Sequence, residues 1–418
     1  MIRTRAPRLA AGAIGCVVMR GNRPTTHTHH IELHRRPAAC LLASAASGAA
    51  QRVEHRDDQC GEGEEAGHSG LLGERVSITI GLMTHPATIF PGGDPDAVAR
   101  CSAMLRGGGL VGMPTETVYG LACDALNPRA VAGVFAAKER PSFDPLIVHV
   151  RDLAHAQALA VFDGTATVLA KRFWPGALTM VLPKKDVIPD IVTSGMPTVA
   201  VRMSGHPVMK EICKVFGKPI AAPSANRFGR ISPTSASAVM KELGGKIPLI
   251  IDGGACNDGL ESTIIRVEVG EKRPQLHLLR AGPVVKEQLQ KIGKVIRKKK
   301  PRDVSEAPGQ LESHYAPAVP LYIFEKPEDF RPDEGKTYGL LSYRGQAKDG
   351  YMDLHDWEVV EELSPGKGKL AEASVRLFHV LRLLDESGVD AIVAETVSET
   401  GLGVAINDRL RRASVTIH

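Results

Sequence analysis

The segment 114–121 (PTETVYGL) and the residues after it place hydroxyls, cations and an imidazole close together along the chain. Thr117 carries a hydroxyl, Lys138 and Arg140 flank a glutamate, and His149 follows an apolar run. Lysine supplies a point charge and arginine a planar fork of donors, and both suit phosphate and carboxylate oxygens. The segment therefore predicts a site that binds a polyanion together with a small polar substrate.

Two further segments carry polar groups at the ends of predicted strands. Arg202 follows apolar residues in the predicted strand 198–203, where a guanidinium must be paired. A substrate carboxylate and a structural Asp or Glu both remain open as its partner. Ser224 and Asn226 follow a predicted strand and offer a hydroxyl, an amide and backbone N–H groups, which suit phosphate or ribose oxygens. A simple turn would use the same residue types.

The sequence lacks the signatures of several other chemistries. It contains no Walker loop, no Ser-His-Asp set and no paired carboxylates of the kind that hydrolases use. Its seven cysteines include no Cys-x-x-Cys pair, which argues against a zinc site or a disulfide framework and favours a reducing compartment. Catalysis in such a site would depend on positioning and on electrostatic stabilisation.

Charge and hydropathy narrow the class of protein further. The net charge of +5 reflects 52 Lys and Arg against 47 Asp and Glu, so charge alone does not indicate a nucleic-acid binder. No apolar run reaches the roughly 18 to 20 residues that a bilayer-spanning helix needs. We expect a cytoplasmic protein that has no contact with a membrane.

Residues 1–82 differ in composition from the rest of the chain. They contain no lysine but ten arginines, and no helical or strand period persists in them. Such a segment cannot bury enough apolar surface to offset its ordering entropy, so we expect it to be disordered. Its arginine-rich, acid-poor beginning fits an organelle transit peptide. A translation start at Met83 would remove the segment altogether, and this late start is the favoured interpretation.

Residues 87–285 predict an α/β domain with a mixed sheet. Asn127 and Pro128 predict the beginning of a helix over 129–138, and Gly217 predicts the end of another over 206–216. Two more helices are expected at 167–173 and 235–243. Strands are expected at 110–113, 145–150, 178–182, 198–203, 249–251, 263–267 and 276–279.

A linker and a smaller domain follow. Residues 286–318 contain a basic run and a Pro/Gly loop, and they predict a solvated connector. Residues 319–418 predict a second α/β domain. Its strands are expected at 319–324, 337–342 and 390–394, and its helices at 370–384 and 403–412.

The motifs of the chain, taken together, resemble a known family. PTETVYGL, KERPSFDPLIVHV, WPGALT, TVAVRMSGHP, APSANRFGRISPT, IDGG, GLESTII and HYAP occur in the order typical of the YrdC-like threonylcarbamoyl-AMP synthases, and GLGVAINDRLRRAS is similar to the longer form with a C-terminal domain. The resemblance runs from about Ala87 to the end. It implies a YrdC-like twisted mixed sheet with flanking helices and a cationic cavity, plus a Rossmann-like second domain.

The resemblance also implies an activity. Members of this family make threonylcarbamoyl-AMP and pyrophosphate from L-threonine, bicarbonate or CO2 and ATP, and separate partner proteins transfer the product to tRNA. Contact of this chain with tRNA would then be indirect. The His314-Tyr315 linker is the expected lid, because the mixed anhydride product hydrolyses readily and needs a cover.

The family's site residues can be carried over to matching positions of this chain. Lys138 and Arg140 are implied as the catalytic pair, facing the triphosphate. The implied ATP-binding residues are Lys138, Arg140, Asp144, Val199, Ser224, Asn226, Ser232, Arg280 and Tyr315. The implied threonine-binding residues are Thr117, His149, Arg202, Ala222 and Ser262. Val199 and Ala222 would contribute backbone contacts only.

Magnesium is the one cofactor that the resemblance implies. Asp144 stands where asparagine is the more frequent residue of the family, and a carboxylate beside ATP would repel phosphate unless Mg²⁺ bridged them. We therefore expect Mg²⁺ to arrive with ATP near Asp144, without a cage of protein ligands.

Two other classes remain open. The cationic surface and the basic linker could bind RNA directly, although aromatic residues make up only 4% of the chain. YrdC-like domains also occur in carbamoylation enzymes that use carbamoyl phosphate. Those enzymes carry zinc-finger and acylphosphatase-like segments, which this chain does not contain.

Overall fold

The structure is a computed structural model that describes residues 86–141, 144–268, 273–297 and 314–415. The predicted disordered extension, residues 1–82, lies outside the described residues, as do most of the basic run and the Pro/Gly loop of the predicted linker. Within the described ranges, none of the helices combines the length and the apolar character that crossing a bilayer requires.

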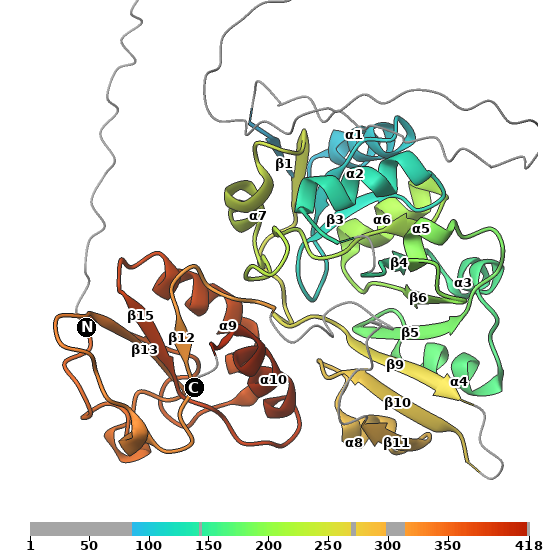
Figure 1. Ribbon diagram of the computed structural model, residues 1–418. Coiled ribbons are helices and arrows are strands. Elements are labelled where there is room, and N and C mark those ends of the chain that lie inside the picture. The colour runs from blue at the N-terminus through green and yellow to red at the C-terminus, as the bar shows by residue number, and fades with distance from the viewer. Residues whose placement is uncertain (1–85, 142–143, 269–272, 298–313, 416–418) are drawn as a thin grey trace, which may run out of the picture. The chain divides into compact units, whose positions relative to one another are not determined.

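The larger of two sheets contains eleven strands in the spatial order β1-β8-β2-β3-β7-β4-β6-β5-β9-β10-β11 (Figure 1). It is mixed, because β4 and β6 pair in parallel whereas β5 and β6 pair antiparallel. This confirms the predicted fold class. The strands are β1 (Thr88–Pro91), β2 (Val111–Met113), β3 (Gly120–Asp124), β4 (Ile147–His149), β5 (Leu178–Pro183), β6 (Thr198–Arg202), β7 (Ile220–Ala221), β8 (Leu249–Asp252), β9 (Thr263–Glu268), β10 (Gln275–Arg280) and β11 (Lys294–Arg297).

Helices cover both faces of this sheet. In β3, Leu121 and Cys123 join the apolar cluster that contains residues of α2, whereas Ala122 joins the cluster formed with α1 and α6. Successive side chains of a strand point to opposite faces, so α2 lies on the face opposite to α1 and α6. The helices are α1 (Pro95–Arg106), α2 (Pro128–Lys138), α3 (Leu153–Leu159), α4 (Gly164–Phe173), α5 (Asp190–Thr193), α6 (Pro207–Phe216), α7 (Ala236–Leu243) and α8 (Lys286–Leu289).

Local capping sets the ends of the helices that carry functional residues. The side chain of Asn127 accepts hydrogen bonds from the N–H groups of Arg129 and Ala130, at 3.0 and 3.3 Å. Helix α2 therefore begins where the sequence predicted and delivers Lys138 at its last turn. Gly217 ends α6 with a φ of 77°, as its type predicted.

Two parts of the large sheet differ from the predictions. Strand β3 was not predicted, because all five of its residues are buried and no alternation of polar and apolar side chains marks it. Residues 286–297 were assigned to the linker, yet they form α8 and β11, and β11 pairs in parallel with β10. Lys and Arg residues at the ends of β11 made this segment resemble a solvated charge run. An edge strand tolerates such residues, so they do not exclude a strand.

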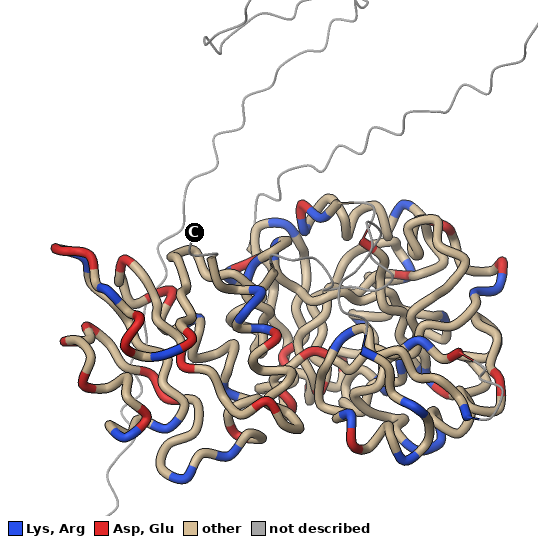
Figure 2. Tube along the Cα trace, turned by 60° about the horizontal axis from the view of Figure 1, so that its bottom comes forward, with Lys and Arg blue, Asp and Glu red and all other residues tan. Residues whose placement is uncertain are grey.

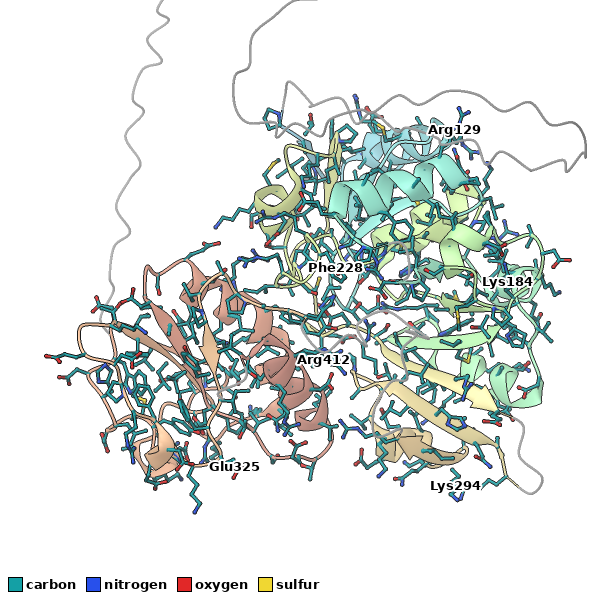
Figure 3. The ribbon with its side chains drawn as sticks, viewed as in Figure 1. Arg129, Lys184, Phe228, Lys294, Glu325 and Arg412 are labelled. Carbon is teal, nitrogen blue, oxygen red and sulfur yellow. The ribbon has the colours of Figure 1, made fainter. Side chains whose placement is uncertain are left out.

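The smaller sheet contains four strands in the order β12-β15-β13-β14, all paired in parallel. Helices α9 (Leu370–Asp385) and α10 (Gly403–Ala413) share one apolar cluster with Leu341 and Ile392, and side chains fill the space between the helices and the sheet (Figure 3). An aromatic cluster covers the other face. The strands are β12 (Leu321–Tyr322), β13 (Tyr338–Ser342), β14 (Val359–Glu362) and β15 (Ala391–Ala394), with short 3-10 turns at Pro327–Asp329 and Ala347–Asp349.

The loop before β9 approaches the backbone of α9 closely at Gly259. Gly259 has a φ of +69°, and a Cβ atom there would lie 2.4 Å from the Cα of Val375 and 2.5 Å from the carbonyl oxygen of Ser374. Backbone atoms cannot move aside as a flexible side chain can. This glycine therefore permits the contact between the loop and α9.

We expect Gly259→Ala to destabilise the protein by about 2 kcal/mol or more, because the left-handed conformation alone costs roughly 1–2 kcal/mol for a residue with Cβ and the contact with α9 adds to it. Urea unfolding measures the effect. Gly195→Ala is the matched control, since Gly195 also has a φ of +77° but nothing lies within 4 Å of a Cβ atom there. Equal losses in the two variants would contradict a tight contact at Gly259.

Candidate active site

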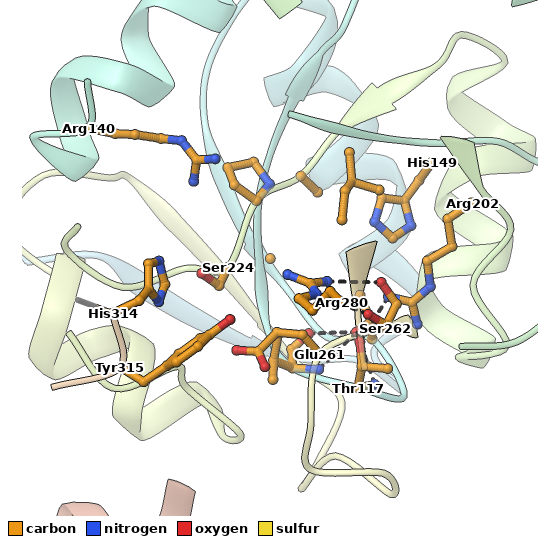
Figure 4. Close-up of a pocket in the computed structure, with 16 residues that line it drawn as sticks. Thr117, Arg140, His149, Arg202, Ser224, Glu261, Ser262, Arg280, His314 and Tyr315 are labelled. Atoms are coloured by element: carbon orange, nitrogen blue, oxygen red, sulfur yellow. Dashed lines mark hydrogen bonds between the residues drawn. The ribbon is translucent and has the colours of Figure 1, made fainter. Parts of the chain in front are cut away.

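A pocket of about 500 Å³ opens where strands β3, β4, β6 and β7 lie side by side in the large sheet (Figure 4). Guanidinium groups, hydroxyls and imidazoles from distant parts of the chain line it. Its lining residues are Thr115, Thr117, Val118, Gly120, Arg140, Ile147, His149, Arg202, Ala222, Pro223, Ser224, Glu261, Ser262, Arg280, His314 and Tyr315. The pocket thus brings together most of the predicted site residues.

Arg202 and two threonines form a directed chain of hydrogen bonds along one wall. Nη1 of Arg202 donates to Oγ1 of Thr117 at 2.9 Å, and this oxygen lies 2.9 Å from Oγ1 of Thr115. The Thr115 hydroxyl donates to the carbonyl oxygen of Val118 at 2.6 Å. Since that bond uses the only hydroxyl hydrogen of Thr115, the Thr117 hydroxyl donates to Thr115. Thr117 therefore keeps a free lone pair but no free hydrogen.

Arg202 is also paired with a carboxylate of the protein itself. Its Nη2 lies 2.8 Å from Oε1 of Glu116, and the Arg202 side chain is almost fully buried. Of the two partners that the sequence left open, the structural carboxylate is therefore present. Burial alone would raise the pKa of the Glu116 carboxyl, but the charge of Arg202 and hydrogen bonds from Ser204 and Gly205 lower it to about 2.

His149 lies on the same wall, at the end of β4. Burial, aided by the charge of Arg202, lowers the pKa of its imidazole to about 3. The ring is therefore neutral at neutral pH. Its Nδ1 atom is buried and has no hydrogen-bond partner among the described residues.

Ser262 and Arg280 form the neighbouring wall, at the ends of β9 and β10. Oγ of Ser262 lies 2.7 Å from Oγ1 of Thr179 and accepts a hydrogen bond from Nη2 of Arg280 at 3.1 Å. Nε of Arg280 donates to the carbonyl oxygen of Ser262 at 3.0 Å. These bonds fix the guanidinium of Arg280 against the pocket.

Arg140 lines the opposite side of the pocket, and Asp144 holds it in place. Nη2 of Arg140 lies 2.8 Å from Oδ2 of Asp144 and donates to the carbonyl oxygen of Pro145 at 3.0 Å, while Nε donates to the carbonyl oxygen of Asp144 at 3.2 Å. The Asp144 side chain is fully buried behind Arg140. This ion pair gives the charge of Asp144 a partner within the protein, and Mg²⁺ near Asp144 stays a prediction.

Lys138 lies behind the pocket rather than on its wall. Its side chain is 1% exposed, and Nζ donates to the carbonyl oxygens of Ser224, at 2.6 Å, and Asn226. Burial and the neighbouring Arg140 lower its pKa well below the usual value. Among the described residues, Lys138 is not part of the pocket lining. It fixes the loop that carries Ser224.

Four other predicted residues divide between the lining and the layer behind it. Ala222 lines the pocket, whereas Val199 is buried in the apolar core beside Leu182. The side-chain amide of Asn226 donates to the carbonyl oxygens of Arg227 and Arg230, which shapes its own loop. The hydroxyl of Ser232 donates to Glu261 at 2.5 Å, so it reaches the pocket only through that carboxylate.

His314 and Tyr315 close the pocket from the side of the C-terminal domain, where the sequence predicted a lid. The N–H of His314 donates to the carbonyl oxygen of Arg412, and the N–H of Ala316 donates to that of Gly229. Tyr315 has a φ of 68° and is 1% exposed, and its hydroxyl is buried without a hydrogen-bond partner among the described residues. The segment is thus held to both domains. The His314 ring also meets the ring of Phe228 edge-on, with the ring centroids 5.9 Å apart.

Two contributors to the site were missed by sequence reasoning: Glu116 and Glu261. Glu116 and Glu261 lie directly beside the predicted residues Thr117 and Ser262. A signal was available in the sequence: a carboxylate beside residues expected to bind an anion is there to pair with a buried cation of the protein.

The described residues contain no group of three or more His, Cys, Asp or Glu side chains that could hold a metal ion. Two carboxylates at the pocket are both engaged, Asp144 with Arg140 and Glu261 with Ser232. This donor set does not fit a resident metal ion. Figure 2 shows Lys and Arg mixed with Asp and Glu along the described chain, rather than gathered in a basic block of the kind that RNA binding would favour.

Comparisons with known proteins give consistent matches. Residues 103–282 match the Sua5, YciO and YrdC family, described as "Telomere recombination", and residues 284–415 match "Threonylcarbamoyl-AMP synthase, C-terminal domain". The chain is 41% identical over 331 residues to a threonylcarbamoyl-AMP synthase of Pyrococcus abyssi, which covers 75% of this chain and 92% of that protein. It is 39% identical over 352 residues to the Bacillus subtilis protein of the same name, which covers 81% and 96%.

A solved structure matches the architecture as well. The crystal structure of P. abyssi Sua5 complexed with L-threonine superimposes with a TM-score of 0.67 at 39% identity, over 76% of this chain and 94% of that one.

The ion pair of Glu116 makes stability depend on pH. A carboxyl whose pKa falls from 4.5 to about 2 on folding contributes stability that is fully present above about pH 4.5 and is lost as the pH falls towards about 2. We expect Glu116→Gln to remove on the order of 3 kcal/mol of this pH-dependent stability, and its unfolding free energy to fall less steeply on acidification. Urea unfolding at several pH values measures it.

Glu139→Gln is the control for this experiment. Like Glu116, Glu139 forms an ion pair, here with Lys246, but the Glu139 side chain is 66% exposed. Its removal should leave the slope of stability against pH nearly unchanged. A slope in Glu116→Gln equal to that of the unmodified protein would contradict the assignment.

Proposed function

The chain belongs to the Sua5, YciO and YrdC family, in the form with the C-terminal domain of threonylcarbamoyl-AMP synthases, and from this premise we propose that it is an L-threonylcarbamoyladenylate synthase. As a nucleotidyltransferase, it makes threonylcarbamoyl-AMP and pyrophosphate from L-threonine, bicarbonate or CO2 and ATP. One observation carries the proposal: three guanidinium groups and five hydroxyls, those of Thr115, Thr117, Ser224, Ser262 and Tyr315, line one pocket. Two anionic substrates need such a wall.

L-threonine occupies the wall of Thr117, His149, Arg202 and Ser262. In the hydrogen-bond chain from Arg202, Thr117 can accept but not donate, so it faces the amine or the hydroxyl of threonine rather than its carboxylate. The carboxylate then lies towards the guanidinium groups of Arg202 and Arg280, which share this half of the pocket. A solved relative is complexed with L-threonine, which supports threonine as a substrate.

The pocket favours the neutral, nucleophilic form of the threonine amine. Arg140, Arg202 and Arg280 surround the cavity, and a nearby positive charge disfavours an ammonium group. His149 has a pKa of about 3 and is a weak base, so its neutral ring orients the substrate rather than removing a proton. The amine lone pair then attacks the carbon of CO2, and the nitrogen releases one proton to solvent. An oxygen of the resulting carbamate attacks the α-phosphorus of ATP as pyrophosphate leaves.

ATP occupies the wall of Arg140, Ser224, Arg280 and Tyr315. Arg140 is held in place by Asp144, so its remaining N–H groups can stabilise the charge that develops on the phosphates. Lys138 supports this wall by fixing the loop of Ser224, and so acts through that loop. Mg²⁺ arrives with ATP and keeps most of its waters, because the described carboxylates are engaged elsewhere.

The product passes to separate proteins that transfer the threonylcarbamoyl group to adenosine in tRNA. The cytoplasm is the compartment we assign, since the cysteines of the described residues are all free thiols.

Threonine-dependent release of pyrophosphate from ATP, in the presence of bicarbonate and Mg²⁺, tests the function. We expect release only when all substrates are present. An RNA-binding protein or an enzyme that uses carbamoyl phosphate would give no release that depends on threonine, and this result would overturn the proposal.

Thr117→Val tests the threonine wall, because it removes the hydroxyl while keeping the shape of the side chain. We expect the KM for threonine to rise about three- to tenfold, the cost of one hydrogen bond, with little change in the KM for ATP. Thr193→Val is the matched control, since Thr193 is equally buried but lies outside the pocket. A change of the KM for threonine and the KM for ATP by the same factor would contradict the assignment of Thr117 to the threonine wall.

A further inference from the structure

Arg409, in helix α10 of the C-terminal domain, is fully buried although it carries a charge. Its Nε donates to Oε2 of Glu261 at 3.0 Å, and its Nη1 lies 3.1 Å from Oδ2 of Asp408. The predicted site contained no residue of this helix. A buried guanidinium is retained only where its partners compensate for lost hydration, so the pair with Glu261 sets the position of Arg409.

Glu261 connects this pair to the pocket. It lines the cavity, and its second oxygen, Oε1, accepts the hydrogen bond from Ser232. It is also the one carboxylate among the described lining residues, which otherwise include three guanidinium groups. Glu261 therefore places a negative charge on a wall that must accept a polyanion.

Arg409 also contacts the lid. The carbon of its guanidinium lies 5.4 Å from the centroid of the Tyr315 ring, within the range of a cation–π contact. Phe378 of α9 packs on the same ring, with the centroids 5.6 Å apart. The ring of Tyr315 is thus held by the C-terminal domain while its hydroxyl lies at the pocket.

The charge of Arg409 has a direct electrostatic consequence. Without it, the carboxylate of Glu261 would keep the hydrogen bond from Ser232 and the nearby charge of Arg280, but it would lose its direct ion pair. Repulsion between that carboxylate and the phosphates would be strong, because a buried pair of charges is poorly screened. Asp408 is already paired with Arg412, whose Nε lies 3.2 Å from Oδ2, and so does not require Arg409.

We infer that Arg409 is a positioning residue for the nucleotide half of the pocket: it neutralises Glu261 and fixes Tyr315, so that the C-terminal domain completes the ATP site. The inference rests on the proposed function in that it takes ATP as the polyanion. Arg409 itself touches neither substrate and acts through Glu261 and Tyr315.

The test compares Arg409→Met and Arg409→Lys in the full chain. We expect Arg409→Met to weaken ATP binding about tenfold or more, as leaving a buried carboxylate unpaired implies. The KM for threonine should change less than about threefold, because Arg409 contacts none of the residues that the proposal assigns to threonine. Arg409→Lys keeps the charge and should recover a large part of the ATP affinity. Loss of both affinities to the same degree, or no recovery with lysine, would overturn the inference.

A double variant separates charge from folding. Arg409→Met with Glu261→Gln removes both charges of the pair, and replacing both partners of a buried pair is often nearly neutral for stability. We expect it to bind ATP more tightly than Arg409→Met alone, and to keep the unfolding temperature of the unmodified protein more closely. If the double variant folds and still binds ATP as weakly as the single variant, neutralisation of Glu261 is not the role of Arg409.

Arg411→Met is the control on the same helix. Arg411 is 53% exposed and pairs with Glu399, so its loss should leave ATP binding unchanged. ATP binding is measured by calorimetry in the presence of Mg²⁺ and without threonine, independently of turnover.

The two proposals can fail separately. If the unmodified protein binds ATP but releases no pyrophosphate, the proposed function fails and this inference does not. If it releases pyrophosphate and Arg409→Met binds ATP normally, only this inference fails. If it does not bind ATP at all, both are overturned.

Discussion

The structure depends on one constraint: three guanidinium groups are buried around one pocket, and each of them needs a partner within the protein. Asp144 holds Arg140, Glu116 holds Arg202, and the hydroxyl and carbonyl of Ser262 hold Arg280. All three guanidinium groups line the pocket. Because these bonds exist without a ligand, the positions of the guanidinium groups are fixed in advance, and such preorganisation is what electrostatic stabilisation of a transition state requires.

The sheet explains how residues far apart in sequence meet at one pocket. Strand β7 lies between β3 and β4, and β6 follows β4, so the ends of four strands converge. His149 and Arg202 are direct neighbours in the register of β4 and β6. Helices on both faces support these strands, and the loops at their ends carry Thr117 and Ser224. The site therefore depends on strand pairing more than on any single loop.

Much of this arrangement could be predicted from sequence, because caps, turn residues and motif blocks are local signals. Helix α2 begins one residue before the predicted range and ends at its last residue, and most of the residues implied by the family line the pocket. The direction of Lys138 could not be predicted, since its position at the end of a helix does not say whether its ammonium faces a ligand or a loop carbonyl. The pairing of Glu116 with Arg202 joins residues 86 positions apart, and it follows only from the tertiary fold.

The contact between Arg409 and Glu261 spans 148 residues of sequence, which has a consequence for the newly made chain. Ribosomes add about 5–20 residues per second, so Glu261 waits on the order of ten seconds before its partner is synthesised. During that time the wall of the pocket that contains Glu261 lacks the arginine that pairs with it. The pocket therefore acquires this ion pair only after helix α10 has left the ribosome, and a chain truncated before α10 would lack it.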